Sequence, residues 1–162
     1  MPDQDRSSRV IGYTELKEKY LPHRYPLVLL DRVTDFSPGE FIEAIKCVTG
    51  NAPDMVGHFP ERSIMPGTSV IQACAQLAIV FFKLSTRDLH DDELTLISSV
   101  NFKFLAPIPP GEVLKLRMTT KTLTKEVGIF DSEATITNGK SVARGTLSLA
   151  RASLGQFAEV PW

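Results

Sequence analysis

Residues Pro66 to Phe82 have the sequence PGTSVIQACAQLAIVFF. Apolar side chains surround most of a helix of about five turns in this stretch, at 3.6 residues per turn, and leave little polar face. A helix of this kind is buried nearly all round in a folded domain. We therefore expect one long central helix that the rest of the chain must cover.

The segments on either side of this helix alternate apolar and polar residues with a period of two, which is typical of strands. A turn at 37–40 joins the first two, and Asn138-Gly139 is the preferred dipeptide of a two-residue hairpin turn. The expected strands are 27–33, 41–48, 94–104, 113–123, 127–137 and 141–149. This pattern predicts an α+β fold in which an antiparallel sheet of about six strands is wrapped around one long central helix.

The length of 162 residues fits one domain, 1–162, with residues 1–10 as a loose polar tail and a short amphipathic helix at 13–20. The free edge or face of its sheet favours pairing with a second subunit.

The composition argues against several kinds of partner. With 18 basic and 19 acidic residues, the net charge of −1 does not favour nucleic acid or an anionic membrane. No stretch approaches the roughly 18 apolar residues of a membrane span, and the N-terminus lacks an apolar signal region, so we expect a cytoplasmic protein. Cys47 and Cys74 lie in apolar stretches without metal-ligand spacing, which favours two reduced, buried thiols and neither a disulfide nor a metal site.

A histidine precedes the start of the central helix, in the run Gly57-His58-Phe59-Pro60. The first N–H groups of a helix have no intrahelical acceptor, so a histidine beside them can move a proton next to a carbonyl that they polarise. A missing N–H has no cost at Pro66, and Gly67 has no side chain to block an approaching carbonyl. Gln72 stands where a carboxylic acid would complete such a site.

Six motifs follow one another between residues 13 and 150. They are Leu21-Pro22-His23-Arg24-Tyr25-Pro26, Leu30-Asp31-Arg32-Val33, Gly57-His58-Phe59-Pro60, Met65-Pro66-Gly67, Gln72-Ala73-Cys74-Ala75-Gln76 and Pro107-Ile108-Pro109-Pro110-Gly111-Glu112. Together they resemble the motifs of the FabZ-type 3-hydroxyacyl-acyl carrier protein dehydratases. The resemblance implies the hotdog fold of that family, an active site shared across a dimer interface, and no cofactor.

The same resemblance assigns roles to residues of this chain. His58 would take the α-proton of a 3-hydroxyacyl thioester, the Gly67 N–H would bind the thioester carbonyl, and the Ile64 carbonyl would orient the imidazole. Gln72 occupies the position of the family's catalytic carboxylate. We therefore expect catalytic roles for His58, Gln72 and Gly67, and substrate binding by Phe59, Ile64, Pro66, Val70 and Gln76.

Gln72 leaves the reaction without its usual acid, because an amide cannot donate a proton and be regenerated at pH 7. His58 could take the α-proton and hand it to the departing hydroxyl, with Gln72 orienting that group. Asp54 or Glu61 could instead serve as the acid, or dehydration could be lost while acyl binding is retained. In a purely structural interpretation, His58 is a packed residue, and Gln72 and Gln76 are buried amides with internal partners.

An acyl chain needs an apolar tunnel, which Val70, Cys74, Leu77, Ile97, Phe102 and Phe104 could line. Acyl carrier proteins are acidic and would dock on basic side chains, for which the candidates are Lys83, Arg87 and Lys103, with Arg24 and Arg62 in addition. Leu105 and Ala106 stand where the family often has basic residues. Carrier docking could therefore be weaker or specialised, or coenzyme A thioesters could replace the carrier.

The leading function is a hydro-lyase acting on 3-hydroxyacyl thioesters of acyl carrier protein, in fatty acid or polyketide biosynthesis, with coenzyme A as the alternative carrier. A hotdog thioesterase and a catalytically impaired acyl-binding or partner subunit are the other two. The expected assembly is a homodimer or a trimer of dimers, possibly heteromeric, without nucleic acid or membrane.

Overall fold

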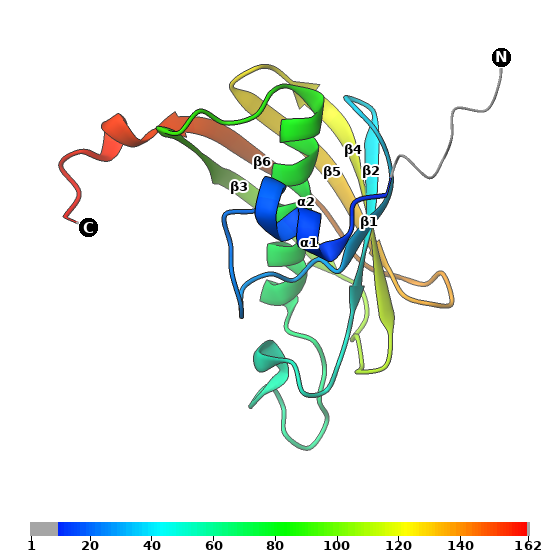
Figure 1. The fold of residues 1–162 in the computed structure, drawn as a ribbon. Helices are drawn as coiled ribbons and strands as arrows, with labels where there is room; N and C mark the ends of the chain where they lie inside the picture. The colour runs from blue at the N-terminus through cyan, green and yellow to red at the C-terminus, as the bar shows by residue number, and fades with distance from the viewer. Residues whose placement is uncertain (1–9, 162) are drawn as a thin grey trace, which may run out of the picture.

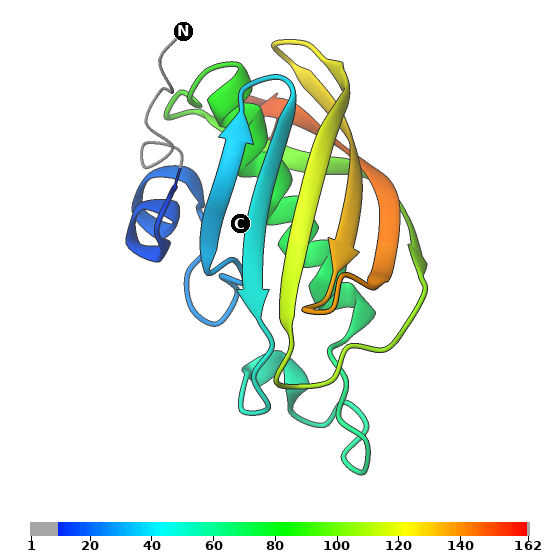
Figure 2. The same ribbon diagram turned by 90° about the vertical axis from the view of Figure 1, so that its right-hand side faces the viewer.

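The central helix α2 (Gly67–Ser85) lies in the concave face of one curved sheet, as Figures 1 and 2 show from two directions. The structure is a computed structural model that describes residues 10–161. Val70, Ala73, Cys74, Leu77 and Phe81 of this helix are at most 1% exposed, so the helix is buried on nearly every side. The long helix predicted from the apolar pattern is confirmed.

Within residues 10–161, the sheet has six strands and every neighbouring pair is antiparallel. In chain order they are β1 (Arg32–Ser37), β2 (Phe41–Cys47), β3 (Glu93–Phe104), β4 (Val113–Leu123), β5 (Val127–Thr135) and β6 (Ser141–Ser153). The order across the sheet is β1-β2-β4-β5-β6-β3, so β1 and β3 form its two edges. The predicted α+β architecture is confirmed.

The first strand is displaced from its predicted position at 27–33, because β1 begins only at Arg32. The preceding segment is held by α2 instead. The Leu29 N–H donates to Gln76 Oε1 at 2.9 Å, and the Leu27 carbonyl accepts from Gln76 Nε2 at 2.5 Å. The buried Gln76 amide thus forms the hydrogen bonds that a neighbouring strand forms in a sheet. Apolar alternation in the sequence does not tell whether a segment bonds to a strand or to a side chain.

Other boundaries agree more closely with the sequence. β5 ends at Thr135 rather than at 137, and β6 continues to Ser153 rather than ending at 149. The helix predicted at 13–20 consists of one α-helical turn, α1 (Tyr13–Glu15), that runs into the π-helical turn η2 (Leu16–Tyr20). Two 3₁₀ turns, η3 (Pro53–Met55) and η4 (Leu154–Phe157), lie before α2 and after β6.

The predicted N-terminal tail lies outside the described residues except for Val10, which is exposed. The chain is already packed at the next residue. Ile11 is 4% exposed and pairs with Val33 of β1 in an isolated bridge.

Two expectations from composition are wrong. α2 is long and apolar enough to cross a membrane by length and composition alone, although we expected no such stretch; in this fold it is the mostly buried core helix. Cys47 is exposed, whereas Cys74 is buried as expected. Cys47 is the last residue of β2, at the end of the strand. This position exposes its side chain even though the surrounding stretch is mostly apolar.

The edge strand β3 carries apolar side chains that its own subunit leaves open. Ile97 and Val100 are both 41% exposed, although they pair with Leu149 and Leu147 of β6, which are fully buried. A β-bulge interrupts the β3–β6 pairing between Ile97 and Ser99. The hydroxyl groups of Ser98 and Ser99 both lie within hydrogen-bond distance of the Ser148 hydroxyl, at 2.8 and 2.6 Å, which ties the bulge to β6.

Candidate active site

His58 is held in one orientation by the loop that precedes α2. Its Nδ1 lies 2.8 Å from the carbonyl oxygen of Ile64. A carbonyl can only accept, so Nδ1 carries the proton and Nε2 is left as a hydrogen-bond acceptor. This is the tautomer that a general base needs, and the contact with Ile64 is the one implied by the resemblance.

The backbone on both sides of His58 is in the left-handed region. Gly57 has φ = 78° and Phe59 has φ = 55°. Glycine adopts this conformation readily, whereas a bulky residue does so at a cost of about 1–3 kcal/mol. The Phe59 ring meets the imidazole edge-on, with ring centroids 4.4 Å apart. The ring contact and the hydrogen bond to Ile64 together orient the imidazole.

His58 opens into a cavity of about 670 Å³ at the start of α2. Its walls are mostly apolar and come from three segments: the His58 loop, the first turn of the helix and the chain that leaves β3. The lining residues are His58, Ile64, Met65, Pro66, Gly67, Thr68, Val70, Phe104, Leu105, Ala106, Pro107 and Ile108.

The helix start supplies hydrogen-bond donors to this cavity. The N–H groups of Ser69 and Val70 donate to the Pro66 carbonyl, whereas the N–H groups of Gly67 and Thr68 have no helical carbonyl within reach. Gly67 has a second reason to lack a side chain. A Cβ at this position would lie 2.8 Å from Cζ of the Phe104 ring, which forms part of the cavity wall. An imidazole acceptor and helix N-terminal donors therefore share one apolar cavity.

Gln72 is not among the residues that line this cavity. It is half-buried on α2, and its Nε2 donates to the Leu27 carbonyl at 3.2 Å, which leaves Oε1 to accept a hydrogen bond. Gln76 lies one turn later, is 1% exposed, and uses both ends of its amide on the backbone of Leu27 and Leu29. The interpretation of Gln76 as a buried amide therefore fits this structure, and substrate binding by Gln76 stays a prediction.

The other predicted substrate-binding residues fall into two groups. Ile64, Pro66 and Val70 line the cavity with His58. Phe59 lines a neighbouring apolar cavity of about 590 Å³, which Ile64 and Pro107 share with the first. Of the residues predicted to line an acyl tunnel, Val70 and Phe104 line this cavity, whereas Cys74 and Leu77 are fully buried in the core and Ile97 and Phe102 are not part of its wall.

The alternative acids lie apart from the imidazole cavity. Glu61 lines the neighbouring cavity with Arg62, and Asp54 lines neither of the two. Among residues 10–161, no group of three His, Cys, Asp or Glu side chains is placed to hold a metal ion. The cavity thus combines His58 with neutral groups.

Most of the basic residues proposed for carrier docking have partners within the chain. Lys83 donates to the carbonyls of Lys19 and Tyr20 and lies 3.8 Å from Asp88. Arg87 forms a bidentate pair with Glu93 at 2.7 and 2.8 Å. Lys83 lies in the last turn of α2 and Arg87 follows the helix, so Lys83 stands about 24 Å along the helix from Gly67 at 1.5 Å per residue. Carrier docking by these two residues stays a prediction.

The remaining cations differ in position. Arg24 uses its guanidinium on the carbonyls of Leu21 and His23. Lys103 lies on the outer face of the sheet beside Arg144 in a shallow hollow. Arg62 lines the neighbouring cavity, which shares Ile64 and Pro107 with the cavity of His58.

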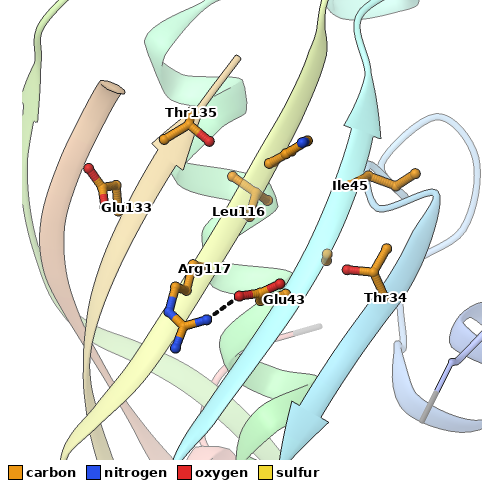
Figure 3. A pocket seen from close by; sticks show the side chains of 9 residues that line it. Thr34, Glu43, Ile45, Leu116, Arg117, Glu133 and Thr135 are labelled. Atoms are coloured by element: carbon orange, nitrogen blue, oxygen red, sulfur yellow. Dashed lines mark hydrogen bonds and ion pairs between the residues drawn. The ribbon is translucent and has the colours of Figure 1, made fainter. Parts of the chain in front are cut away.

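A further hollow of about 400 Å³ lies on the outer face of the sheet, over β1, β2, β4 and β5 (Figure 3). Its charged side chains follow the strand register, in which Glu43 faces Arg117 and Arg117 faces Glu133. Glu43 and Arg117 form an ion pair, drawn as the dashed line. Neighbouring charges of opposite sign on a solvated sheet face have a structural explanation, so this hollow is not the candidate site.

Sequence reasoning missed several contributors to the site, among them the Leu27 carbonyl, Leu105 and Ala106. The Leu27 carbonyl holds the Gln72 amide across 45 positions of the chain, and no local pattern signals that contact. Leu105 and Ala106, considered only as missing basic residues, form part of the cavity wall. Both residues are apolar and directly follow a strand that ends beside the helix start, and this could have indicated that they line the cavity.

Comparison with known proteins gives consistent results. Residues 21–146 match the FabA-like domain family. Coronafacic acid dehydratase of Pseudomonas savastanoi pv. glycinea is 40% identical over 159 residues, which is 98% of this chain and 95% of that protein. The 3-hydroxyacyl-[acyl-carrier-protein] dehydratase FabZ of Thioalkalivibrio sulfidiphilus is 41% identical over 137 residues, 82% of this chain and 91% of that protein.

Solved structures support the same fold. The dehydratase heterocomplex ApeI:P from Xenorhabdus doucetiae aligns with a TM-score of 0.73 at 20% identity, over 88% of this chain and 95% of the solved chain. A thioesterase from Haemophilus influenzae aligns with a TM-score of 0.59 at 16% identity, over 77% of this chain and 79% of that one. These likenesses, with the six-stranded sheet around α2, confirm the hotdog fold.

Proposed function

The chain belongs to the FabA-like family, and from that premise we propose that it removes water from 3-hydroxyacyl thioesters carried on acyl carrier protein to give 2-enoyl thioesters. Its similarity to named dehydratases over nearly the full length makes it a hydro-lyase of fatty acid or polyketide biosynthesis. A cytoplasmic location is part of this proposal.

One observation supports the catalytic assignment above all. The contact between His58 Nδ1 and the Ile64 carbonyl leaves Nε2 as an acceptor, in the same cavity as the helix start at Gly67. The α-proton of a thioester becomes acidic enough for imidazole only when the developing enolate oxygen is stabilised. Helix N-terminal donors supply several kcal/mol of such stabilisation in an apolar cavity.

The reaction then takes place in two proton movements. With the thioester oxygen at the Gly67 N–H, His58 Nε2 takes the α-proton, and the electrons of the broken C–H bond form the enolate. When the enolate collapses, the C–O bond to the 3-hydroxyl breaks, the α,β double bond forms, and the imidazolium returns its proton to the departing oxygen. One water leaves, and His58 is again neutral.

We assign to Gln72 an orienting role. Because the Leu27 carbonyl holds its Nε2, the free Oε1 can accept the O–H of the substrate hydroxyl. The hydroxyl oxygen would then turn its lone pairs toward the imidazolium. As Gln72 does not line the cavity of its own His58, this role requires the Gln72 of a second subunit.

We propose a homodimer in which the β3 strands of two copies pair at their free edges. The exposed side chains of Ile97, Val100 and Phe104 give this edge an apolar character that a lone subunit leaves in water. A trimer of such dimers, or pairing with a related subunit, would use the same edge.

Incubation with a 3-hydroxybutyryl-carrier thioester tests the proposed function. Dehydration gives the enoyl thioester, which absorbs in the ultraviolet, and we expect this product. Release of a free thiol would instead identify a thioesterase. Binding without turnover would identify an impaired subunit, the outcome that the amide at Gln72 would explain. Repeating the assay with the coenzyme A thioester decides between the two carriers.

A further inference from the structure

The segment that follows β6 is apolar and has little support from its own subunit. It comprises residues 154–161 and begins with η4 (Leu154–Phe157). Leu154 is 44% exposed and Val160 is 45% exposed. Figure 1 shows this segment extending away from the sheet and α2. It also lies beyond residues 21–146, which match the FabA-like family.

The segment begins beside the first residue of β3, far from the active site of its own subunit. Ser153 pairs with Glu93, the first residue of β3, whereas the wall of the His58 cavity begins at Phe104, the last. Eleven residue steps of strand separate these ends by about 36 Å, at 3.3 Å per residue. Eight extended residues span at most about 28 Å. The segment is therefore too short to cover the cavity of its own subunit.

A second copy of the chain removes this difficulty. Two β3 strands that pair antiparallel across a two-fold axis place the Glu93 end of one beside the Phe104 end of the other. The residues that would meet the segment there are open: Phe104 is 51% exposed and Leu105 is 47% exposed. Both line the cavity that contains His58.

We propose that residues 154–161 of each subunit pack on Phe104 and Leu105 of the second copy and form the outer wall of its acyl cavity. Leu154 and Val160 supply the apolar surface for this contact. The contact removes exposed apolar area on both sides and keeps water away from the acyl chain and the enolate. The inference rests on the proposed function for its catalytic consequence and on the paired β3 edges for its geometry.

Mixed dimers test whether the segment acts on the second copy. Chains with two different affinity tags are co-expressed, and dimers carrying both tags are isolated. In the first arrangement, a complete chain with His58→Ala is paired with a His58 chain that lacks residues 154–162. In the second, the chain with His58→Ala also lacks residues 154–162, and its partner is complete. Each dimer then has one His58 and one segment.

We expect the first arrangement to retain about half of the wild-type kcat with an unchanged KM, because its one functional cavity is covered by the other chain. The second should show at least a fivefold lower kcat/KM. The reverse order, or equal activities, would overturn the proposal. The full-length substitutions Leu154→Asp and Val160→Asp, made together in place of the truncation, should give the same order, since both side chains are exposed.

A crosslinking experiment locates the segment independently of enzyme activity. Val160→p-benzoylphenylalanine is prepared in a dimer of one ¹⁴N and one ¹⁵N chain, and the photoproducts are mapped by mass spectrometry. We expect links between the two isotopes, from position 160 to residues 58–67 or 104–108. Links within one chain, or to other regions, would overturn the placement. If the wild type proves inactive, the proposed function fails while this placement is still tested.

Discussion

The two ends of α2 differ in how their polar groups are satisfied. At the N-terminal end, Gly67 and Thr68 open into an apolar cavity beside His58, with donors that no helical carbonyl can reach. At the C-terminal end, the Phe82 carbonyl accepts both the N–H and the hydroxyl of Thr86, at 3.0 and 2.6 Å. One end is kept open to an incoming group, and the other is closed.

A buried arginine completes the closed end. The side chain of Arg151 is 1% exposed, lies over the Phe82 ring at 5.0 Å, and donates to Thr86 Oγ1 and to backbone carbonyls of the loop that follows α2. Glu93 pairs with both Arg151 and Arg87. The comparison teaches that anchoring and the proposed chemistry are separated along one helix, since the closed end anchors the helix whose open end faces the His58 cavity.

The largest effect is expected at the open end. His58→Ala removes the only base assigned to the cavity and should lower kcat by about 10²–10⁴-fold, the usual contribution of a general base. The rate of enoyl formation measures this loss. His90→Ala, at an exposed position, is the matched control and should leave the rate unchanged. Wild-type activity in the His58 variant would remove the catalytic assignment.

Arg151→Ala tests the closed end. It removes a buried cation together with its contacts to Glu93, Phe82 and the loop after α2, and should destabilise the fold by about 3–5 kcal/mol. Urea unfolding measures the change. Arg144→Ala, on the same strand but exposed, should change the free energy of unfolding by less than about 0.5 kcal/mol. Equal effects of the two substitutions would mean that the closed end is not specially anchored.

Gly67→Ala places a methyl group within 3 Å of the Phe104 ring and should destabilise the fold by about 1–3 kcal/mol, with a fall in kcat/KM. Phe104→Leu in the same chain should relieve the clash and restore part of both quantities. A double-mutant cycle between the two positions measures the coupling. Purely additive effects would contradict a direct contact between Phe104 and the helix start.

Gln72→Glu should raise dehydratase kcat by about tenfold, equivalent to about 1.4 kcal/mol. The Leu27 carbonyl can accept from a protonated carboxyl but repels a carboxylate, so it would raise the pKa of the new side chain and favour the acid form. Gln72→Met, which has a similar length and no amide, should lower kcat. A folded Gln72→Glu variant with unchanged kcat would show that the amide is not the limiting group.

The smallest effect concerns pH at the closed end. Hydrogen bonds from Arg87, the His90 N–H and Arg151 hold the pKa of the Glu93 carboxyl well below its ordinary value of 4.5. Because the folded pKa is lower than the unfolded one, the stabilisation is present above pH 4.5 and is lost as the pH falls below it. Glu93→Gln should therefore have a lower melting temperature than the wild type at pH 7, and the difference should shrink below pH 4.5. A constant difference at all pH values would contradict this linkage.

The sequence predicted the elements whose signal is periodic. The burial of α2 and the alternation of the strands follow from the spacing of apolar residues, and the contact between His58 and Ile64 followed from the resemblance. Contacts between distant residues carry no such period. Arg151 donates to Thr86, which lies 65 positions earlier in the chain. The segment around Leu29 alternates like a strand, but the Leu29 N–H donates to the Gln76 side chain and not to a neighbouring strand. Lys83 and Arg87 looked like free cations because their partners become neighbours only in the folded chain.

The β-bulge between Ile97 and Ser99 has a consequence for how this chain could evolve. A straight free edge accepts almost any extended chain, including strands that build fibrils, whereas a kinked edge accepts only a strand whose kink falls at the matching position. After gene duplication, moving the kink by one residue in one copy would put its alternate side chains on the opposite face. Each daughter protein could then pair only with copies of itself through that single change, without any substitution in the His58 cavity.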